Sequence, residues 1–324
     1  MQLTKDQPAA TQSYLKAQGL LQPEETLAST TKAGEGNMNV TLLVTTNQRR
    51  FILKQARPYV AKFPDIPAPI ERIDVEHRYL QATNDDPALA YHHPKVLHYD
   101  KANHTLLLEY LAEARDATYV YNKDGDFTKA QLRELLRYLS ALHRLSVSDF
   151  PPNRELRQLN HAHIFDLPFR PDNGFPLDDL FPALAGVARP YQNDDALRNK
   201  VKQLGERYLA DGRQLIHGDF YPGSFMTRGE EVFVIDGEFA HRGLPEFDLG
   251  VLMAHLLLAK SEPERLAQLD KDYAKPATFD AKLTRQFCYV EVMRRLIGIA
   301  QLPLDLTLPE RQSLLEQARL GLLS

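Results

Sequence analysis

The chain is poor in the features that mark several classes of protein. Only one of its 324 residues is cysteine, which excludes an internal disulfide and favours a reducing compartment. The formal net charge is only −4, so neither a nucleic-acid backbone nor an acidic membrane surface is an expected partner. The most apolar stretch, Leu249–Ala259, is too short to cross a bilayer and contains His255. The first residues read MQLTKDQPAATQSYLKAQG and lack the apolar core of a signal peptide.

These absences favour a cytoplasmic protein that binds neither nucleic acid nor membrane. The composition that remains is ordinary for a globular enzyme, because 43% of the residues are hydrophobic and 25% are charged. A chain of 324 residues can form one large or two medium domains with a substantial core.

The most informative stretch is Leu215–Gly250, which reads LIHGDFYPGSFMTRGEEVFVIDGEFAHRGLPEFDLG. It begins as a short apolar strand and opens into a polar loop. A β-hairpin then follows, with predicted strands Ser224–Thr227 and Glu231–Ile235 joined by a turn at residues 228–230. Antiparallel pairing about that turn brings the residues after the second strand back to the start of the first.

Four oxygen-bearing side chains are therefore expected at one end of this hairpin: Asp219, Ser224, Asp236 and Glu238. Carboxylates that lie close together repel one another, and a bound hard cation usually offsets this repulsion. Oxygen ligands with no cysteine nearby suit Mg²⁺ better than Zn²⁺, and phosphoryl transfer is the commonest chemistry of such a site. The alternative is a plain hairpin whose acids are solvated.

A second set of residues lies near the N-terminus. The β-rich runs Val40–Thr45 and Arg49–Gln55 flank a turn, which sets Lys54 opposite Thr41 and beside the glycine-containing stretch AGEGNMN at 33–39. Free backbone N–H groups beside a fixed cation can hold a phosphate. A plain β-turn is the alternative for the glycines.

The helix predicted at Pro69–Ala82 carries a carboxylate on its apolar side. Ile73, Glu76 and Leu80 recur at helical spacing, so Glu76 faces the packed side. An ionised carboxylate there is costly without a partner, and Lys54 on the neighbouring strand is the expected one. A surface interaction with Arg72 is the alternative.

The stretch FCYVEVMRRLIGIA at 287–300 predicts a mostly buried helix with Arg294 and Arg295 in its middle. Buried guanidinium groups need paired acids or a polar cleft; partial exposure at the surface is the alternative. Two arginines in a binding cleft would argue against a polycationic ligand.

Several of these motifs resemble one family of small-molecule kinases. HGDFYPGS resembles the catalytic loop H-x-D-x-x-x-x-N of aminoglycoside phosphotransferases and eukaryotic-like small-molecule kinases, with Ser224 at the Asn position. IDGEFA stands where other kinases have D-F-G. The Ser, the D-x-E, GEGNMN, LKQARPYV and MRRLIGIAQ together resemble the methylthioribose kinase branch, and the likeness runs from Ala33 to about Gln301.

The resemblance implies an α+β, two-lobed protein-kinase-like fold. Residues 1–110 would form a small antiparallel-sheet lobe with one inserted helix, and residues 111–324 a larger, mainly helical lobe with the catalytic loop and the substrate pocket. Backbone groups at Glu109 and Leu111 resemble the kinase hinge that pairs with adenine, although any edge strand offers such groups.

The resemblance further implies nucleotide and metal roles. ATP and Mg²⁺ are the implied cofactors. Lys54, positioned by Glu76, would hold ATP phosphates, and Asn37 or Asn39 would help to close the glycine loop. The implied metal ligands are Ser224, Asp236 and Glu238.

The implied reaction is phosphorylation of a sugar hydroxyl, with 5-methylthioribose as the expected acceptor and its 1-phosphate as the product. Asp219 would accept or orient the hydroxyl proton, Arg294 and Arg295 would bind the acceptor, and His217 would brace the loop. A homodimer is implied by the resemblance alone.

Three departures leave the acceptor open. The chain is shorter than the enzymes it resembles. It has no Trp, whereas the family carries a Trp-containing loop in the region that corresponds to Val60–Pro69. Gly237 replaces the Pro of D-P-E. The alternatives are an aminoglycoside, choline or homoserine kinase activity on the same fold, or a catalytically silent nucleotide-binding pseudokinase.

Overall fold

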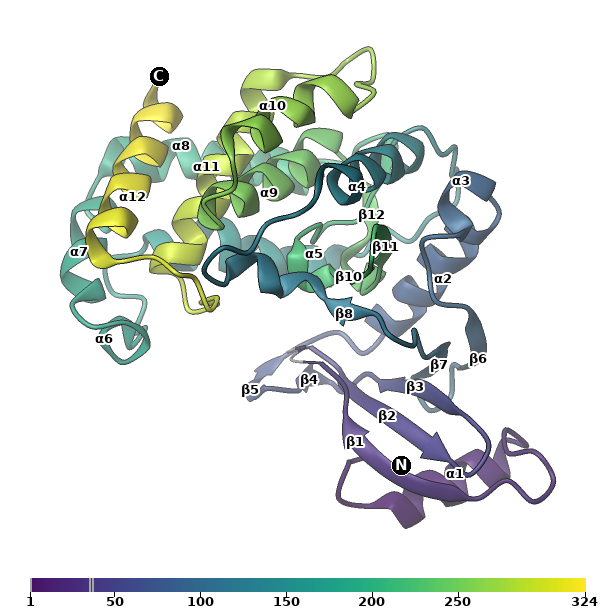
Figure 1. Cartoon of the computed structure of the whole chain (residues 1–324). Helices are drawn as coiled ribbons and strands as arrows, with labels where there is room; N and C mark the ends of the chain where they lie inside the picture. The colour runs from purple at the N-terminus through teal and green to yellow at the C-terminus, as the bar shows by residue number, and fades with distance from the viewer. Residues whose placement is uncertain (1, 35, 37) are drawn as a thin grey trace. The chain divides into compact units, whose positions relative to one another are not determined.

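The computed structural model describes residues 2–34, 36 and 38–324, which form two compact units (Figure 1). Unit 1 comprises Met1–Arg115 and Phe233–Glu238, and unit 2 comprises Asp116–Val232 and Phe239–Ser324. The division at residue 110 that the sequence suggests assigns residues 111–115 and 233–238 to the second lobe instead.

Unit 1 is built on a five-stranded antiparallel sheet in the order β1-β2-β3-β7-β6. The strands of the sheet are β1 Leu27–Lys32, β2 Val40–Thr46, β3 Arg50–Gln55, β6 Val96–Asp100 and β7 Thr105–Glu109. The other elements of the unit are α1 Pro8–Ala17, the short pair β4 Tyr59–Val60 and β5 Phe63–Pro67, α2 Arg72–Asn84 and α3 Pro87–Ala90.

The two faces of this sheet are buried against different helices. On one face, Leu42, Val44 and Leu53 pack with Tyr14 and Leu15 of α1. On the other, Leu106 and Leu108 of β7 pack with Ile73 and Leu80 of α2. Alternation of side chains along each strand makes both faces apolar. The predicted pairing of Lys54 with Thr41 is confirmed by the register of β2 and β3.

Unit 2 is mainly helical. Its helices are α4 Lys129–Leu142, α5 Arg154–His161, α6 Leu177–Leu180, α7 Leu184–Gln192, α8 Asp195–Leu209, α9 Pro245–Leu258, α10 Pro263–Asp272, α11 Ala281–Ile297 and α12 Leu308–Leu323. A π-helical turn at Ala162–Asp166 and 3₁₀ turns at Ala117–Tyr121, Leu167–Phe169 and Pro222–Ser224 supplement them. A small two-stranded sheet pairs β9 Gln214–Ile216 with β12 His241–Gly243.

Three further short strands form one small sheet. They are β8 Arg115–Asp116, β10 Phe225–Arg228 and β11 Glu231–Val234, in the sheet order β11-β10-β8. The predicted hairpin is therefore present, with Gly229 at its turn in the left-handed region at φ 59°. Its first strand begins one residue later than predicted, because Pro222 starts a 3₁₀ turn that ends at Ser224.

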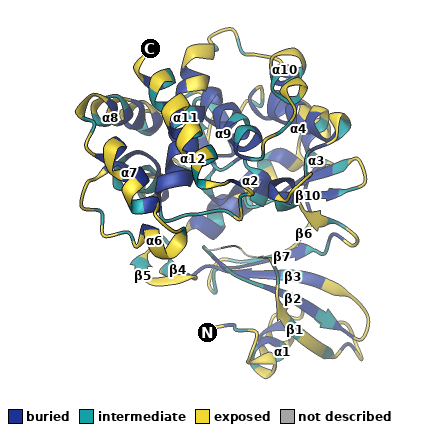
Figure 2. Ribbon diagram, turned by 60° about the vertical axis from the view of Figure 1, so that its left-hand side comes forward, coloured by how far each residue is buried: buried dark blue, intermediate teal, exposed yellow. Residues whose placement is uncertain are grey.

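The core of unit 2 is centred on α9 and α11, which are buried along most of their length (Figure 2). Gly250 on α9 lets the two helices approach closely. A Cβ at that position would lie 2.7 Å from the Thr284 carbonyl oxygen and 2.9 Å from the Phe287 Cβ. Within the described residues, no helix is long and apolar enough to span a bilayer.

This contact predicts that Gly250→Ala destabilises the protein by about 1–3 kcal/mol, because the added methyl group meets the backbone of α11. The matched control is Gly186→Ala in α7, where a Cβ would meet nothing within 4 Å. The control should be neutral or stabilising by up to about 1 kcal/mol. Urea unfolding followed by circular dichroism measures both; equal effects would show that Gly250 does not set the helix spacing.

Candidate functional site

The predicted site residues fall in both units, and each unit is described by itself. In unit 1 they gather around Lys54, which lies on β3 and is 5% exposed. Its Nζ donates a hydrogen bond to Glu76 Oε1 at 2.6 Å and another to Asp236 Oδ1. Burial lowers the pKa of Lys54, but the carboxylates of Asp236 and Glu76 outweigh it, and the net pKa is raised. The two carboxylates therefore favour the charged ammonium form.

The predicted pairing of Lys54 with Glu76 is present in the structure. Arg72, the alternative partner of Glu76, interacts with it electrostatically and also donates hydrogen bonds to other residues. It donates to Asn39 Oδ1 at 2.9 Å and to the carbonyl oxygens of Arg57 and Pro69 at 2.7 Å each.

Asp236 is held in an unusual backbone conformation. Its φ is 62°, in the left-handed region that disfavours most side chains. The next residue, Gly237, has no room for a side chain, because a Cβ there would lie 2.3 Å from Cδ1 of the Tyr79 ring. Strained backbone of this kind is concentrated at functional sites, where the surrounding packing holds it in place.

Glu238 is 5% exposed and lies among polar side chains. It accepts a hydrogen bond from Asn39 Nδ2 at 3.0 Å and lies 3.3 Å from Arg72 Nε. Burial raises the pKa of Glu238 to about 8, although the Arg72 guanidinium opposes the rise. Asn39 therefore links the glycine-containing stretch to one of the predicted metal ligands. Asn37 lies outside the described residues.

The donor chemistry of this group fits a nucleotide with a hard cation. Two carboxylates are ligands that Mg²⁺ accepts, and an ammonium group beside them suits phosphate oxygens. In the described part of the chain, no group of three or more His, Cys, Asp or Glu side chains is arranged to hold a metal ion. Ser224, the third predicted ligand, belongs to unit 2, and its meeting with Asp236 and Glu238 remains a prediction.

The hinge positions also lie in unit 1. Glu109 ends β7, and its N–H donates to the Lys95 carbonyl oxygen at 2.9 Å. Leu111 follows two residues later, is 8% exposed, and accepts a hydrogen bond from Ala114 through its carbonyl oxygen. Their pairing with adenine remains a prediction.

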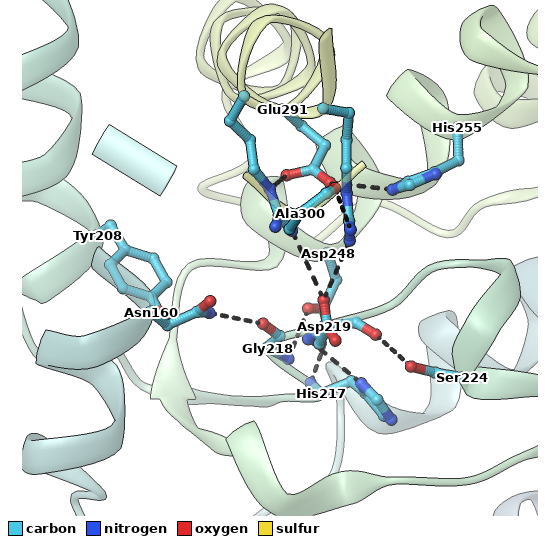
Figure 3. Close-up of polar contacts among 12 residues, drawn as sticks. Asn160, Tyr208, His217, Gly218, Asp219, Ser224, Asp248, His255, Glu291 and Ala300 are labelled. Atoms are coloured by element: carbon cyan, nitrogen blue, oxygen red, sulfur yellow. Dashed lines mark hydrogen bonds and ion pairs between the residues drawn. The ribbon is translucent and has the colours of Figure 1, made fainter. Parts of the chain in front are cut away.

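In unit 2, the loop after β9 carries Asp219 and is folded back on itself (Figure 3). The Asp219 carbonyl oxygen accepts hydrogen bonds from Ser224 Oγ at 2.8 Å and from the Tyr221 N–H at 3.1 Å. The Asp219 N–H donates to His217 Nδ1 at 3.3 Å. Ser224 and His217 therefore brace the loop; the metal-binding role of Ser224 is not tested by these contacts.

The same loop is anchored by Asp248, in the first turn of α9. This fully buried carboxylate accepts the N–H groups of His217 at 2.7 Å and Gly218 at 2.9 Å, and lies 3.2 Å from His143 Nε2. Burial acts to raise the pKa of Asp248, but hydrogen bonding and the charge interaction with His143 and His217 outweigh it, so the pKa is lowered.

Arg294 and Arg295 are 6% and 5% exposed and share one acid. Glu291 accepts Arg294 Nε at 2.6 Å through Oε2 and Arg295 Nε at 2.8 Å through Oε1. The Nη2 atoms of the two arginines lie 3.9 Å and 4.0 Å from Asp219 Oδ1 (Figure 3). The structure brings both arginines to Asp219 and rules out the alternative of surface exposure.

The charge environment of Asp219 is balanced. Its side chain is 23% exposed. Burial raises the pKa of Asp219, and Glu291 adds to the rise, while Arg295 and Arg294 oppose it. A carboxylate whose pKa lies above its usual value is a better proton acceptor than an ordinary aspartate.

Sequence reasoning missed Glu291 and His255. Glu291 precedes the arginines by three and four residues, the spacing at which helix side chains meet, so VEVMRR carried the signal. His255 lies on α9 and donates to Glu291 across the helix interface, a contact that no local spacing reveals.

The bracing role of Asp248 gives a testable prediction. Asp248→Asn should lower stability by about 2–3 kcal/mol at neutral pH, because a charged acceptor of two buried N–H groups is lost. Since the folded-state pKa of Asp248 is lowered, its contribution is complete above the ordinary value of 3.8 and is lost as the pH falls through the folded-state value.

Melting temperatures of wild type and variant, measured from about pH 3 to 7, should therefore converge only at the acid end. Asp195→Asn, an exposed acid in the first turn of α8, is the control and should change little. A difference that is independent of pH, or one no larger than that of the control, would contradict the bracing role.

Comparison with known proteins places this geometry in context. Residues 29–283 match the phosphotransferase enzyme family, APH. The chain is 28% identical over 284 residues to a methylthioribose kinase of Geobacillus sp. (strain WCH70), covering 81% of this chain and 70% of that protein. It is 28% identical to a methylthioribose kinase of Cronobacter sakazakii (76% of this chain, 64% of that one) and 26% identical to methylthioribose kinase 2 of Oryza sativa subsp. japonica (70% and 56%).

The match thus spans between 56% and 70% of the length of these three relatives. Among solved structures, choline kinase LicA from Streptococcus pneumoniae superposes with a TM-score of 0.56 at 16% identity, covering 97% of this chain and 98% of that one. A spectinomycin phosphotransferase in complex with ADP and spectinomycin gives 0.55 at 12% identity, with 98% and 97% covered.

At such low sequence identity the structural similarities show the fold alone, and they confirm the predicted α+β, kinase-like fold. The family match extends over most of the sequence. The chain belongs to the phosphotransferase enzyme family.

Proposed function

We propose that this chain is an ATP-dependent kinase that phosphorylates a hydroxyl group of a neutral sugar, with 5-methylthioribose as the acceptor and its 1-phosphate as the product. The observation that carries the proposal is the group in unit 2, where two buried guanidinium groups on one carboxylate converge on Asp219. The methylthioribose kinase relatives support the choice of acceptor.

The roles of the residues follow from their chemistry. Mg²⁺–ATP, when bound, supplies the phosphoryl group and the cation that offsets its charge. Lys54, held by Glu76, would bind phosphate oxygens, and Asp236 and Glu238, with Ser224, would hold the cation. Asn39 would fix the glycine loop through its bond to Glu238. Backbone groups at Glu109 and Leu111 would pair with adenine.

Asp219 would accept the proton of the acceptor hydroxyl, since its raised pKa suits a general base. Arg294 and Arg295 would hold acceptor oxygens and offset the negative charge that develops during transfer. Together with Glu291 they leave the formal charge around Asp219 balanced, two positive against two negative. A polycation would place further positive charge beside two guanidinium groups, so a neutral polyol fits better.

Two further properties are proposed on narrower grounds. A cytoplasmic location is supported by the single cysteine. A homodimer is supported by the resemblance to methylthioribose kinases, and sedimentation of the purified chain would test it.

The acceptor is tested by measuring Mg²⁺-dependent ATP consumption with 5-methylthioribose beside kanamycin, choline and simple sugars. We expect turnover with 5-methylthioribose, lost in Arg294→Ala. Turnover with another acceptor alone would retain the kinase and discard the sugar. ATP binding without turnover on any acceptor would favour the pseudokinase.

The role of Asp219 gives a separate prediction. Asp219→Asn should reduce kcat by about 10²- to 10⁴-fold, because an amide cannot accept the hydroxyl proton. ATP affinity, measured by calorimetry, should stay at the wild-type value, because Asp219 is not among the nucleotide-binding residues. Full activity in this variant would show that another group accepts the proton.

A further inference from the structure

A continuous line of buried polar groups in unit 2 leads to the two arginines through Glu291. The Tyr121 hydroxyl lies 2.6 Å from His255 Nδ1, and His255 Nε2 lies 3.0 Å from Glu291 Oε1. Tyr121 is 2% exposed, and His255 and Glu291 are 1% exposed each. The three residues come from the 3₁₀ turn Ala117–Tyr121, from α9 and from α11.

The direction of each hydrogen bond in this line is determined by the charge of Glu291. Burial acts to raise the pKa of Glu291, but Arg294 and Arg295 outweigh it, and the pKa lies well below its usual value. An ionised carboxylate only accepts hydrogen bonds, so His255 must donate to it through Nε2–H. Burial lowers the pKa of His255 to about 4, so the ring is neutral and its Nδ1 accepts the proton of the Tyr121 hydroxyl.

Glu291 in turn determines how the two guanidinium groups lie. Both of its oxygens accept an arginine Nε, which fixes one edge of each planar group. Arg295 is held further by the Tyr221 ring, whose centroid is 4.7 Å from its Cζ, and by the Ala300 carbonyl oxygen, 3.4 Å from Nη1. Arg295 is thus held at three places, by Glu291, by Tyr221 and by Ala300.

The outer edges of the arginines form long ion pairs with Asp219 and no hydrogen bond to it. The distances of 3.9 Å and 4.0 Å from their Nη2 atoms to Asp219 Oδ1 exceed a hydrogen bond. Two donors are thus held near the proposed base while they remain available to another acceptor atom. Holding them there without Glu291 would place two like charges together in a buried setting, which is unfavourable.

We propose that Glu291, His255 and Tyr121 are positioning residues that hold Arg294 and Arg295 in the geometry that binds the acceptor. The proposal deepens the proposed function and rests on it. None of the three touches the acceptor; each acts through the next residue in the line, and the arginines alone make the contact. N–H donors that are fixed in this way suit an acceptor molecule with several oxygen atoms close together, such as a polyol.

Glu291→Gln is the direct test, because it keeps the shape and removes the charge. The amide NH₂ must face either Arg294 Nε or the donors at Oε1, so at least one guanidinium loses its anchor. We expect the KM for 5-methylthioribose to rise about 10- to 100-fold, the range for misplaced binding groups. The KM for ATP should not change, because ATP binding uses other residues.

The matched control is Glu246→Gln, a buried glutamate on α9 that accepts the Asp280 N–H at 2.8 Å. It makes the same chemical change away from the arginines, so it should lower the melting temperature while leaving the acceptor KM as in wild type. If Glu291→Gln behaves like this control, its role is only structural and the proposal is overturned.

Tyr121→Phe is the mild variant, since it removes one hydroxyl and little volume. It should raise the acceptor KM less than Glu291→Gln does. Adding it to Glu291→Gln should cause no further rise, because both act on the same line of hydrogen bonds. Independent, additive effects of the two substitutions would overturn the line as a unit.

Nitrogen NMR of the histidine rings gives a readout that needs no turnover. The His255 signal, assigned with His255→Gln, should be that of a neutral ring protonated at Nε2. A ring protonated at Nδ1 would overturn the proposal even in an active kinase. Failure of the proposed function gives a different result. In that case wild type and Asp219→Asn would consume ATP equally slowly with 5-methylthioribose.

Discussion

A charged side chain that is buried needs a partner of opposite charge, and this requirement determines the main polar contacts in both units. In unit 1 it ties Lys54 to Glu76 and Asp236, and Arg72 to Glu238. In unit 2 the same requirement ties Arg294 and Arg295 to Glu291. Buried ion pairs add little net stability, because desolvation consumes most of the attraction. What they do provide is a fixed geometry, since removal of either partner leaves an uncompensated charge.

Much of the site could be predicted because its determinants are local. Hairpin register placed Lys54 opposite Thr41, and helical spacing placed Glu76 on the packed face. The partner of Arg72 could not be predicted in this way. Arg72 was available to Glu76 by sequence spacing, yet it bonds Asn39, which lies in the glycine-containing stretch. No pattern within either segment encodes that choice, because it depends on how the sheet and the helix pack.

The fold was also easier to predict than the details of its loops. Runs of β-branched and leucine residues defined the sheet, and leucine spacing defined the long helices. By contrast, the sequence predicts Ser224 in a strand, whereas the structure has it in a 3₁₀ turn. Pro222 begins this turn, and its backbone preference is stronger than the strand preference of the residues that follow. In this turn the Ser224 hydroxyl donates a hydrogen bond to the Asp219 carbonyl oxygen and so closes the loop.

The segment Phe233–Glu238 belongs to unit 1, although the residues on either side of it in the sequence belong to unit 2. The N-terminal unit is consequently not a contiguous piece of the chain. A fragment that ended at Arg115 would retain Lys54 and Arg72 but would lack Asp236 and Glu238, and would bury positive charge without its full complement of acids. Related sequences can therefore exchange these two units by recombination only with three crossovers, after Arg115, Val232 and Glu238, so that the short segment moves with the rest of its unit.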